Sequence, residues 1–354
     1  MADADVYQRE TERLLRDDSP SASLMCATHK HVPRVLLDAL AASTRIKTAH
    51  FELTEWNDES CAMLLASGGP NEALDSLFLT RNHITSAGLP MLSAAAISRG
   101  RLKNLNLSSN PLGDQLASLA QSVVTSHIEQ LTLDETQQRG EGILGLATAL
   151  AAGAGTCKLR ALHLQNNGID DHVASSVAAL LVSTGVHELL LGRNAIADRG
   201  ASKFALAIAP RHGARCALRR LSLVFNQVTN AGACDFAHAL ADPASSLLML
   251  NLGHNLIGDA GCAALTRAVQ HNHRLEKLDL GVNPAAKHAT DALRVAMSAE
   301  ARKQRQHIAF LGVAKLLLLA QSRPYVPEAA DPPSWASLPH CVLVQILQLA
   351  SPLA

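Results

Sequence analysis

A leucine pattern that returns at nearly constant spacing constrains this chain of 354 residues more than any other feature. It is clear in LDSLFLTRNHI, which begins at Leu74. Good copies share its apolar positions and its asparagine, and they begin at Leu102, Leu159, Val186, Leu218, Leu247 and Leu275. Weaker copies begin at Ile46 and Ile128, with Thr54 and Thr136 in the asparagine position. The steps from Ile46 to Leu275 average about 29 residues, a period typical of a solenoid of stacked repeats.

In each copy, inward apolar residues alternate with outward residues, which is the period of a β-strand. Leu77 and Leu79 are predicted to face the core, with Phe78 between them facing out. The chain must turn after each strand, and buried backbone N–H and C=O groups in such a turn need partners. An asparagine side chain carries both donors and an acceptor, so it can supply them. We predict a structural ladder through Asn82, Asn110, Asn167, Asn194, Asn226, Asn255 and Asn283.

Between the strands the apolar period becomes helical. Residues 143–150 place apolar side chains at i, i+3, i+4 and i+7, and residues 173–181 form a similar stripe. Glycines stand near the expected start of several helices, where we assign them to tight turns: Gly88, Gly200, Gly232 and Gly261. Each unit is therefore predicted as a strand, a turn and a helix.

The copies fit the motif L-x-x-L-x-L-x-x-N-x-[IVL] over about residues 43–300. In this they resemble leucine-rich repeats of the ribonuclease-inhibitor-like type. The resemblance implies an α/β fold, a leucine-rich repeat solenoid (horseshoe) of about nine repeats. Its parallel strands would line the concave face, and its helices would cover the convex face.

The two ends are predicted to protect the core, because a solenoid exposes its core at an uncapped end. Residues 1–42 are predicted as an N-terminal helical cap, with helices over 5–15 and 32–43, and residues 301–322 as a C-terminal capping helix. Residues 323–354 contain a Pro-rich linker and an amphipathic helix, LPHCVLVQIL, which resembles the opening helix of an F-box. That resemblance implies a cullin-ligase adaptor as partner. The alternative is that residues 335–349 only pack on the solenoid or on another partner.

Composition and charge argue against two classes of partner. Lys plus Arg and Asp plus Glu both number 31, so the chain lacks the basic excess that favours nucleic acid or a membrane surface.

The N-terminal segment MADADVYQRETERLL has no apolar signal-peptide core. The apolar run Ile308–Ala320 is interrupted by Lys315 and is too short to span a bilayer. The seven cysteines form no C-x-x-C pair, which favours reduced thiols and a cytoplasmic or nuclear location.

No residue pattern predicts catalysis, a cofactor or a metal site. The pairs His29/His31 and His271/His273 are not part of the recognisable four-ligand spacing that zinc sites usually need. Neither a G-x-S-x-G motif nor a P-loop motif occurs. We therefore expect a protein that is not an enzyme and that binds no cofactor.

The outward-facing strand positions form the predicted partner surface. Interface hot spots favour aromatic and arginine residues in desolvated patches, which singles out Phe225, Arg193 and Arg220. The full predicted set consists of Phe78, His163, Leu190, Arg193, Arg220, Val224, Phe225 and Met249. The expected function is that of a non-enzymatic scaffold for a protein partner whose identity the residues do not give.

Two other functions stay open. A GTPase-activating protein similar to the Ran GTPase activators would use the same repeat type and bind a small GTPase. Arg81 is the early candidate for the arginine that such an activator would supply. The F-box-like helix instead predicts a substrate receptor of a cullin-type ubiquitin ligase.

Overall fold

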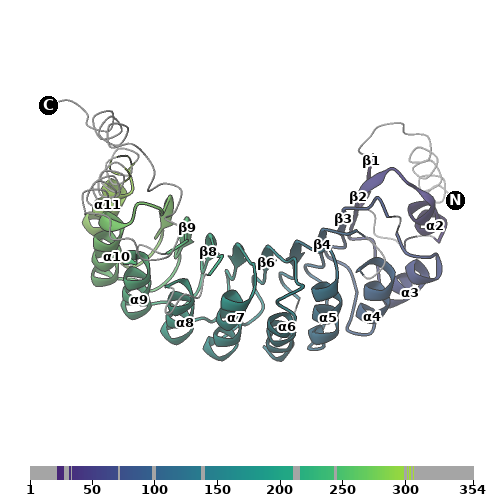
Figure 1. Ribbon diagram of the computed structural model, residues 1–354, viewed down its shortest axis with the longest axis horizontal. Coiled ribbons are helices and arrows are strands. Elements are labelled where there is room, and N and C mark those ends of the chain that lie inside the picture. Colours follow the sequence, from purple (N-terminus) through teal and green to yellow (C-terminus); the bar gives the residue numbers. More distant parts are fainter. Residues whose placement is uncertain are drawn as a thin grey trace, which may run out of the picture.

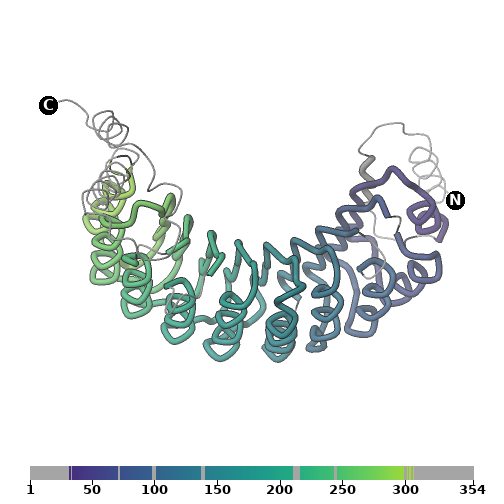
Figure 2. Tube along the Cα trace, viewed as in Figure 1, coloured from purple at the N-terminus to yellow at the C-terminus, as the bar shows by residue number. Residues whose placement is uncertain are grey.

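The computed structural model describes residues 22–27, 32, 34–70, 72–97, 101–136, 140–209, 216–242, 245–298, 301, 303 and 306. These residues form an arch whose strands line the concave side and whose helices cover the convex side (Figure 1). The Cα trace shows the same unit repeated along the arch (Figure 2). The predicted α/β horseshoe is confirmed.

The described strands form one parallel sheet in which spatial order follows sequence order. They are β1 (Ala22–Ala27), β2 (Ile46–Glu52), β3 (Ser76–Phe78), β4 (Asn104–Asn106), β5 (Gln130–Thr132), β6 (Ala161–His163), β7 (Glu188–Leu190), β8 (Arg220–Ser222), β9 (Met249–Asn251) and β10 (Lys277–Asp279). Equivalent residues of neighbouring repeats pair, so Leu105 lies between Leu77 and Leu131. From β3 to β9 this central leucine is at most 2 % exposed, which makes it the core of each repeat.

The helices follow the strands on the convex side (Figure 1). They are α2 (Arg34–Ala42), α3 (Asp58–Ala66), α4 (Leu89–Leu92), α5 (Leu116–Thr125), α6 (Glu141–Ala152), α7 (Asp171–Ser183), α8 (Asp198–Ile208), α9 (Asn230–Ala241), α10 (Asp259–His271) and α11 (Lys287–Ala296). A short π-helical segment, η1 (Ser93–Ile97), continues α4. The apolar stripes predicted over residues 143–150 and 173–181 are buried in α6 and α7, as expected.

The N-terminal end contains an element that the sequence pattern does not predict. The helix expected over residues 32–43 is α2, but residues 22–27 form β1, which pairs with β2 and extends the sheet. The leucine pattern does not reveal β1 because its sequence, ASLMCA, carries neither the leucine spacing nor the asparagine. The helix expected over residues 5–15, residues 307–322 of the predicted capping helix and all of residues 323–354 lie outside the described residues.

The asparagines lie in the turns that follow the strands and link each repeat to the one before it. The Nδ2 of Asn226 donates to the carbonyl oxygens of Leu191 at 2.9 Å and Leu223 at 3.1 Å. Its Oδ1 accepts from the N–H of Ile196 at 3.0 Å. Bonds that reach back one repeat in the same way are made by Asn82, Asn110, Asn167, Asn194, Asn255 and Asn283. Each side chain thus satisfies backbone groups of the preceding repeat, and all but that of Asn167 also bond to their own turn.

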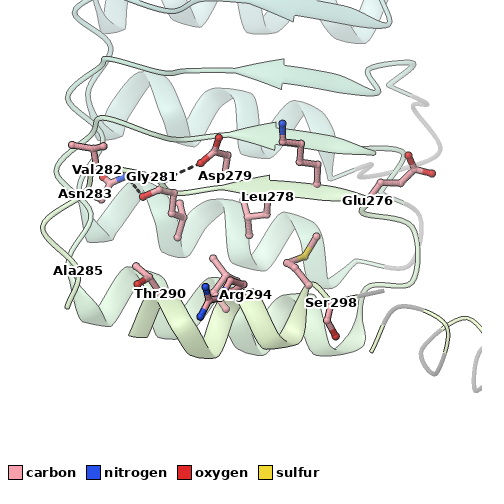
Figure 3. Close-up of a pocket in the computed structure, with 14 residues that line it drawn as sticks. Glu276, Leu278, Asp279, Gly281, Val282, Asn283, Ala285, Thr290, Arg294 and Ser298 are labelled. Atoms are coloured by element: carbon pink, nitrogen blue, oxygen red, sulfur yellow. Dashed lines mark hydrogen bonds between the residues drawn. The ribbon is translucent and has the colours of Figure 1, made fainter. Parts of the chain in front are cut away.

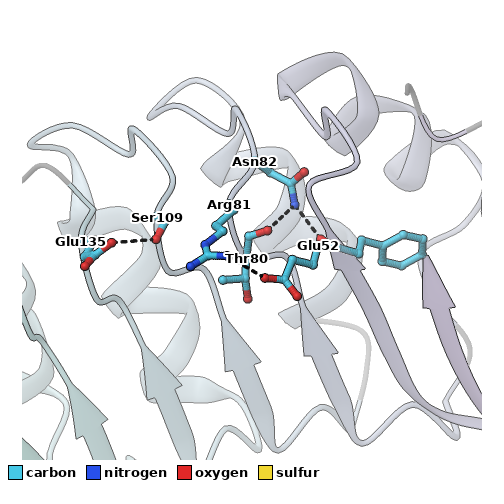
Figure 4. Close-up of polar contacts among 7 residues, drawn as sticks. Glu52, Thr80, Arg81, Asn82, Ser109 and Glu135 are labelled. Atoms are coloured by element: carbon cyan, nitrogen blue, oxygen red, sulfur yellow. Dashed lines mark hydrogen bonds and ion pairs between the residues drawn. The ribbon is translucent and has the colours of Figure 1, made fainter. Parts of the chain in front are cut away.

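The two threonines in asparagine positions are held by the repeats that follow them. Thr54 donates its N–H and its hydroxyl to Oδ1 of Asn82, at 3.0 and 3.2 Å. Thr136 does the same to Oδ1 of Asn167, at 2.9 and 3.0 Å. Figure 4 shows the other side of Asn82, whose Nδ2 donates to the carbonyl oxygens of Phe51 and Thr80. A weak copy of the motif is therefore ordered by the good copy next to it.

A second polar ladder joins the helix starts, and the leucine pattern gives no sign of it. Asp198, the first residue of α8, accepts from the N–H groups of Thr229 at 2.8 Å and Gly232 at 2.9 Å, which open α9. N–H groups at the start of the following helix bond in the same way to Asp171, Asn230 and Asp259. The cap positions of α8, α10 and α11 are Ala, Gly and Ala, which have no side-chain acceptor. The preceding repeat therefore supplies the cap that these helices lack.

The helix-start ladder gives a different reason for the glycines from the one that the sequence suggests. Gly200, Gly232 and Gly261 are the third residues of α8, α9 and α10, so the assignment to tight turns is wrong for them. A Cβ atom on Gly232 would lie 2.8 Å from Oδ1 of Asp198 and 3.0 Å from Cβ of Ala201. These glycines are needed because the neighbouring helix and its carboxylate approach closely, and not for a left-handed backbone.

Gly232→Ala should destabilise the fold, although alanine is normally the better helix former. The methyl group would push the Asp198 carboxylate away from the start of α9, so we expect the free energy of unfolding to fall by about 1–3 kcal/mol. Gly145→Ala in α6 is the matched control, because its Cβ would make an ordinary contact with Ala117 at 3.5 Å. The control should gain about 0.5–1 kcal/mol. Denaturant titration followed by circular dichroism measures both changes, and equal effects would contradict the close-approach argument.

Asn226→Ala should cost about 2 kcal/mol of stability, because it leaves the N–H of Ile196 without its acceptor inside the turn. The control is Gln227→Ala at the next, exposed position. There the backbone N–H bonds to the carbonyl oxygen of Ile196 at 2.9 Å, and alanine keeps that bond. The denaturation midpoints of the two variants should separate clearly. A Gln227→Ala protein that loses as much stability as Asn226→Ala would show that the asparagine side chain is dispensable.

Candidate functional site

The outward side chains of β2 to β10 form the concave surface, called here the strand face. Its middle row consists of His50, Phe78, Asn106, Thr132, His163, Leu190, Ser222, Asn251 and Asp279. The row before it consists of Thr48, Ser76, Asn104, Gln130, Ala161, Glu188, Arg220, Met249 and Lys277. The row after it consists of Glu52, Thr80, Ser108, Asp134, Gln165, Gly192, Val224, Gly253 and Gly281. Parallel pairing in register aligns the members of each row side by side.

A polar chain crosses the strand face from β5 to β8. Thr132 Oγ1 lies 3.5 Å from His163 Nδ1, and His163 Nε2 lies 3.4 Å from Glu188 Oε1, an ion-pair distance without hydrogen-bond geometry. The other carboxylate oxygen of Glu188 lies 3.2 Å from Arg220 Nη1. The order of hydroxyl, imidazole and carboxylate is that of a catalytic triad, but Thr132 is buried. Its distance to the imidazole also exceeds the roughly 2.6–3.2 Å of a nucleophile and its base, so the geometry favours a tie between strands.

A pocket of about 170 Å³ opens on the strand face across β7 to β10. Leu190 and Met249 form its apolar side, and Arg220 and Lys277 supply its cations. The rest of the lining consists of Leu221, Ser222, Leu250, Asn251 and Asp279. Three members of the predicted partner surface therefore meet here. Lys277 is a fourth participant that the sequence criterion misses, because hot-spot statistics favour arginine over lysine.

The residue before each ladder position has a left-handed backbone in every repeat from β3 to β10. These residues, called here the turn row, have φ between 52° and 57° and are Arg81, Ser109, Glu135, Asn166, Arg193, Phe225, His254 and Val282. The conformation costs a residue other than glycine about 1–2 kcal/mol, and it is an outlier for a β-branched residue such as Val282. The hydrogen bonds of the residue that follows, an asparagine in every case but Thr136, fix the turn. The fold therefore holds one side chain per repeat at the edge of the strand face, whatever its type.

The C-terminal half of the turn row contains a stack of three side chains, called here the turn stack. The guanidinium carbon of Arg193 lies 4.9 Å from the centre of the Phe225 ring. The other neighbour of that ring is the His254 imidazole, with 3.8 Å between the ring centres and 14° between the planes. Phe225 is 43 % exposed and Val282 is 73 % exposed, so apolar surface at these turns is open to a partner. The sequence criterion selects Arg193 and Phe225 singly but misses His254, which holds the same repeat position.

The side chains in the N-terminal half of the turn row are polar, and they bond to one another or to Glu52. Arg81 Nη1 lies 3.4 Å from Glu52 Oε1, and Ser109 Oγ lies 3.2 Å from Glu135 Oε2 (Figure 4). The other oxygen of Glu135 accepts from Asn166 Nδ2 at 3.3 Å. Arg81, the arginine considered for a GTPase activator, is therefore held by a carboxylate of the same molecule.

The remaining members of the predicted set lie apart from the pocket and the turn stack. Phe78 stacks on His50 between β3 and β2, with 4.3 Å between ring centres and 2° between planes. His163 belongs to the polar chain. Val224 fills space beside Gly192, where a Cβ atom would lie 2.8 Å from Val224 Cγ1. The predicted surface is thus divided, and its compact part lies over β7 to β10.

A second, larger hollow of about 740 Å³ lies between β10 and α11 at the end of the described repeats (Figure 3). Leu278 is half-buried there, whereas its counterpart Leu250 in β9 is 1 % exposed. Leu293 and Arg294 line the hollow from α11. The apolar part of this hollow is the open edge of the core, which a further unit of a solenoid would cover. The predicted capping helix over residues 301–322 stays a prediction for that role.

Free thiols are found at Cys61, Cys157, Cys216, Cys234 and Cys262. Burial raises the pKa values of Cys157, Cys216 and Cys262. Burial raises the pKa of Cys61 to about 12, partly offset by the hydrogen bond that Trp56 Nε1 donates to its sulfur at 3.2 Å. A thiol of that kind is protonated at neutral pH and is a poor nucleophile. Within the described ranges, no three His, Cys, Asp or Glu side chains converge as a metal site requires. Among the same residues, no helix is long and apolar enough to cross a bilayer.

Known proteins with leucine-rich repeats match parts of this chain. A family model described as Leucine Rich repeat matches residues 156–173 and 244–265. NACHT, LRR and PYD domains-containing protein 14 of Mus musculus is 30 % identical over 223 residues, which cover 61 % of this chain and 19 % of that protein. Ribonuclease inhibitor of Sus scrofa is 27 % identical over 251 residues, which cover 69 % of this chain and 54 % of the inhibitor. The chain therefore spans less than two thirds of the length of these relatives.

A solved structure of a TLR13–ssRNA13 complex covers 78 % of this chain and 34 % of that chain, at 17 % identity and a TM-score of 0.46. This likeness is too slight to support a statement about function.

The stacked histidine of β2 should make stability depend on pH. Burial lowers the pKa of His50, and the nearby Glu52 only partly opposes this. The unfolded chain then binds the proton more readily, so stability should fall as the pH drops below about 6.5 toward the lowered pKa of the folded state. His50→Gln should flatten the dependence of the denaturation midpoint on pH between about 7 and 5. Identical slopes for the variant and the wild type would show that His50 is not the group responsible.

Proposed function

We propose that this chain, a leucine-rich repeat protein of the ribonuclease-inhibitor-like type, is a non-enzymatic scaffold that binds a protein partner on its concave face. The contact centres on β7 to β10, where the pocket and the turn stack belong to neighbouring repeats. A fold of this kind offers surface rather than chemistry, and the pocket and the turn stack are what support binding.

The observation that carries the proposal is the exposed turn stack beside a pocket that has an apolar side, formed by Leu190 and Met249. Aromatic and arginine side chains dominate the binding energy of protein interfaces when they lie next to pockets that exclude water. Phe225 is 43 % exposed although it stacks on two neighbours, so its ring is pre-positioned and little side-chain entropy is lost on binding. The asparagine ladder holds the turns below it, which keeps the surface in one arrangement.

The comparisons support a protein as the ligand. One relative is named ribonuclease inhibitor, and by that name it acts on an enzyme that is itself a protein. It shares the repeat type with this chain, but the match covers 54 % of its length. We carry over only the class of ligand and not the ribonuclease.

Neither alternative function gains support from the described residues. The Arg81 side chain lies 3.4 Å from Glu52 in an exposed ion pair, so a partner would compete with Glu52 for it. The F-box-like segment over residues 335–349 lies outside the described residues, and recruitment of a cullin-ligase adaptor stays a prediction from the sequence.

Two double variants of the full chain test which face binds. Leu190→Glu with Met249→Glu places charges in the pocket, whereas Val182→Glu with Leu206→Glu places them on exposed apolar positions of α7 and α8. Proteins captured from a cell lysate and quantified by mass spectrometry should fall at least about tenfold with the strand-face variant and stay unchanged with the helix-face control. Circular dichroism checks that both variants fold. Loss of the captured partner with the helix-face control alone would overturn the proposal.

A further inference from the structure

We infer that the partner segment bound over β7 to β10 is acidic, with carboxylates on both sides of an apolar side chain. The inference rests on the proposed function and specifies the chemistry of its partner.

The carboxylates at these positions are all engaged within the molecule. Glu52 and Glu188 pair with arginines at 3.4 and 3.2 Å. Asp134 accepts from the backbone and side chain of Gln165 at 2.7 and 3.1 Å. Asp279 accepts from the N–H of Gly281 at 2.9 Å (Figure 3). The fifth, Glu135, accepts from two turn-row side chains at 3.2 and 3.3 Å.

Two of the cations on the same surface have no such partner. Among the described residues, Arg193 and Lys277 form no ion pair, whereas Arg81 and Arg220 do. Arg193 rests on the Phe225 ring, which leaves the guanidinium edge and its N–H donors available. Lys277 lines the pocket. From β7 to β10, the cations of the strand face and turn row are Arg193, Arg220 and Lys277, and the carboxylates are Glu188 and Asp279. This part of the surface therefore carries a net charge of +1, whereas the carboxylates outnumber the cations over β2 to β6.

The surface between these two cations contains an apolar patch. Leu190 and Met249 line the pocket, and its volume of about 170 Å³ is close to the ~150 Å³ of a cavity that holds a benzene ring. One leucine, methionine or phenylalanine side chain of a partner fits that space. Phe225 and Val282 add exposed apolar surface at the turns beside it. A matching ligand therefore needs an apolar side chain in the middle and negative charge at both ends.

The separation of the two cations sets the length of the segment. They lie three strands apart and differ by five positions along the repeat. Strand spacing of roughly 4.8 Å and a rise of roughly 3.3 Å per residue place their backbones on the order of 20 Å apart. An extended chain covers that distance in about six residues. The segment is thus expected to carry acidic residues about six positions apart, with the apolar residue between them.

Selection of peptides by the full chain tests this chemistry without knowledge of the natural partner. A display library of random 12-residue peptides is selected on the wild-type protein, and fluorescence anisotropy measures the Kd of each enriched peptide. We expect enriched peptides with Asp or Glu on both sides of Leu, Met or Phe. Their Kd should rise at least about tenfold in the variant Arg193→Glu with Lys277→Glu. Peptides in which Lys replaces the acidic residues should bind that variant better than they bind the wild type.

The matched control reverses two exposed cations on the helix side, Arg199→Glu with Lys203→Glu in α8, and should leave the Kd unchanged. Enrichment of basic or uncharged peptides, no enrichment at all, equal weakening in the control, or self-association of the chain through this face would each overturn the inference. The two proposals fail separately. If the captured partner depends on Leu190 and Met249 but not on Arg193 and Lys277, the scaffold function stands and the acidic segment does not. If capture of the partner depends neither on Leu190 and Met249 nor on Arg193 and Lys277, both proposals are wrong.

Discussion

The hydrogen bonds of the turn asparagines are the constraint on which the rest of this structure depends. Where the chain turns after a strand, its buried backbone N–H and C=O groups have no partner in the sheet. Each such group left without a hydrogen bond would lower the free energy of unfolding by about 1–3 kcal/mol. One asparagine serves its own turn and the turn before it, as Asn226 does for Leu223 and Ile196. The carboxylates at the helix starts make an equivalent link on the convex side, as Asp198 does for Gly232. Adjacent repeats are thus tied on both sides of the leucine core, so the concave face is a rigid frame.

The same turn links stability to function. It fixes a left-handed residue before each ladder position, and the side chain there is free to vary because it points away from the core. In the N-terminal half these side chains satisfy one another, as Ser109 and Glu135 do. In the C-terminal half they form the turn stack of Arg193, Phe225 and His254, which leaves apolar surface and positive charge open. Polar side chains that already bond to one another gain little from a partner. Exposed apolar surface and unpaired cations can instead be buried and paired when a partner binds.

The sequence predicts the frame better than the surface. Core leucines such as Leu77 are encoded directly by a period of two, so their burial follows from the pattern. The sequence misplaces Gly232 in a turn, because a glycine can be needed either for backbone freedom or for the absence of a Cβ atom. A sequence does not separate these two needs. The stack of Phe225 on His254 joins residues one repeat apart, so it emerges only when repeats are aligned position by position. Lys277 stands out because it forms no ion pair among the described residues, and only the structure shows this.

Hydrogen–deuterium exchange of the full chain, free and bound to its captured partner, tests the central claim most directly, because it reads every repeat at once. The account predicts that binding slows exchange in the strands and turns over residues 186–194, 218–226, 247–255 and 275–283, while α7 to α10 exchange as before. Protection confined to the helices, or spread over β2 to β5 and absent from β7 to β10, would contradict it.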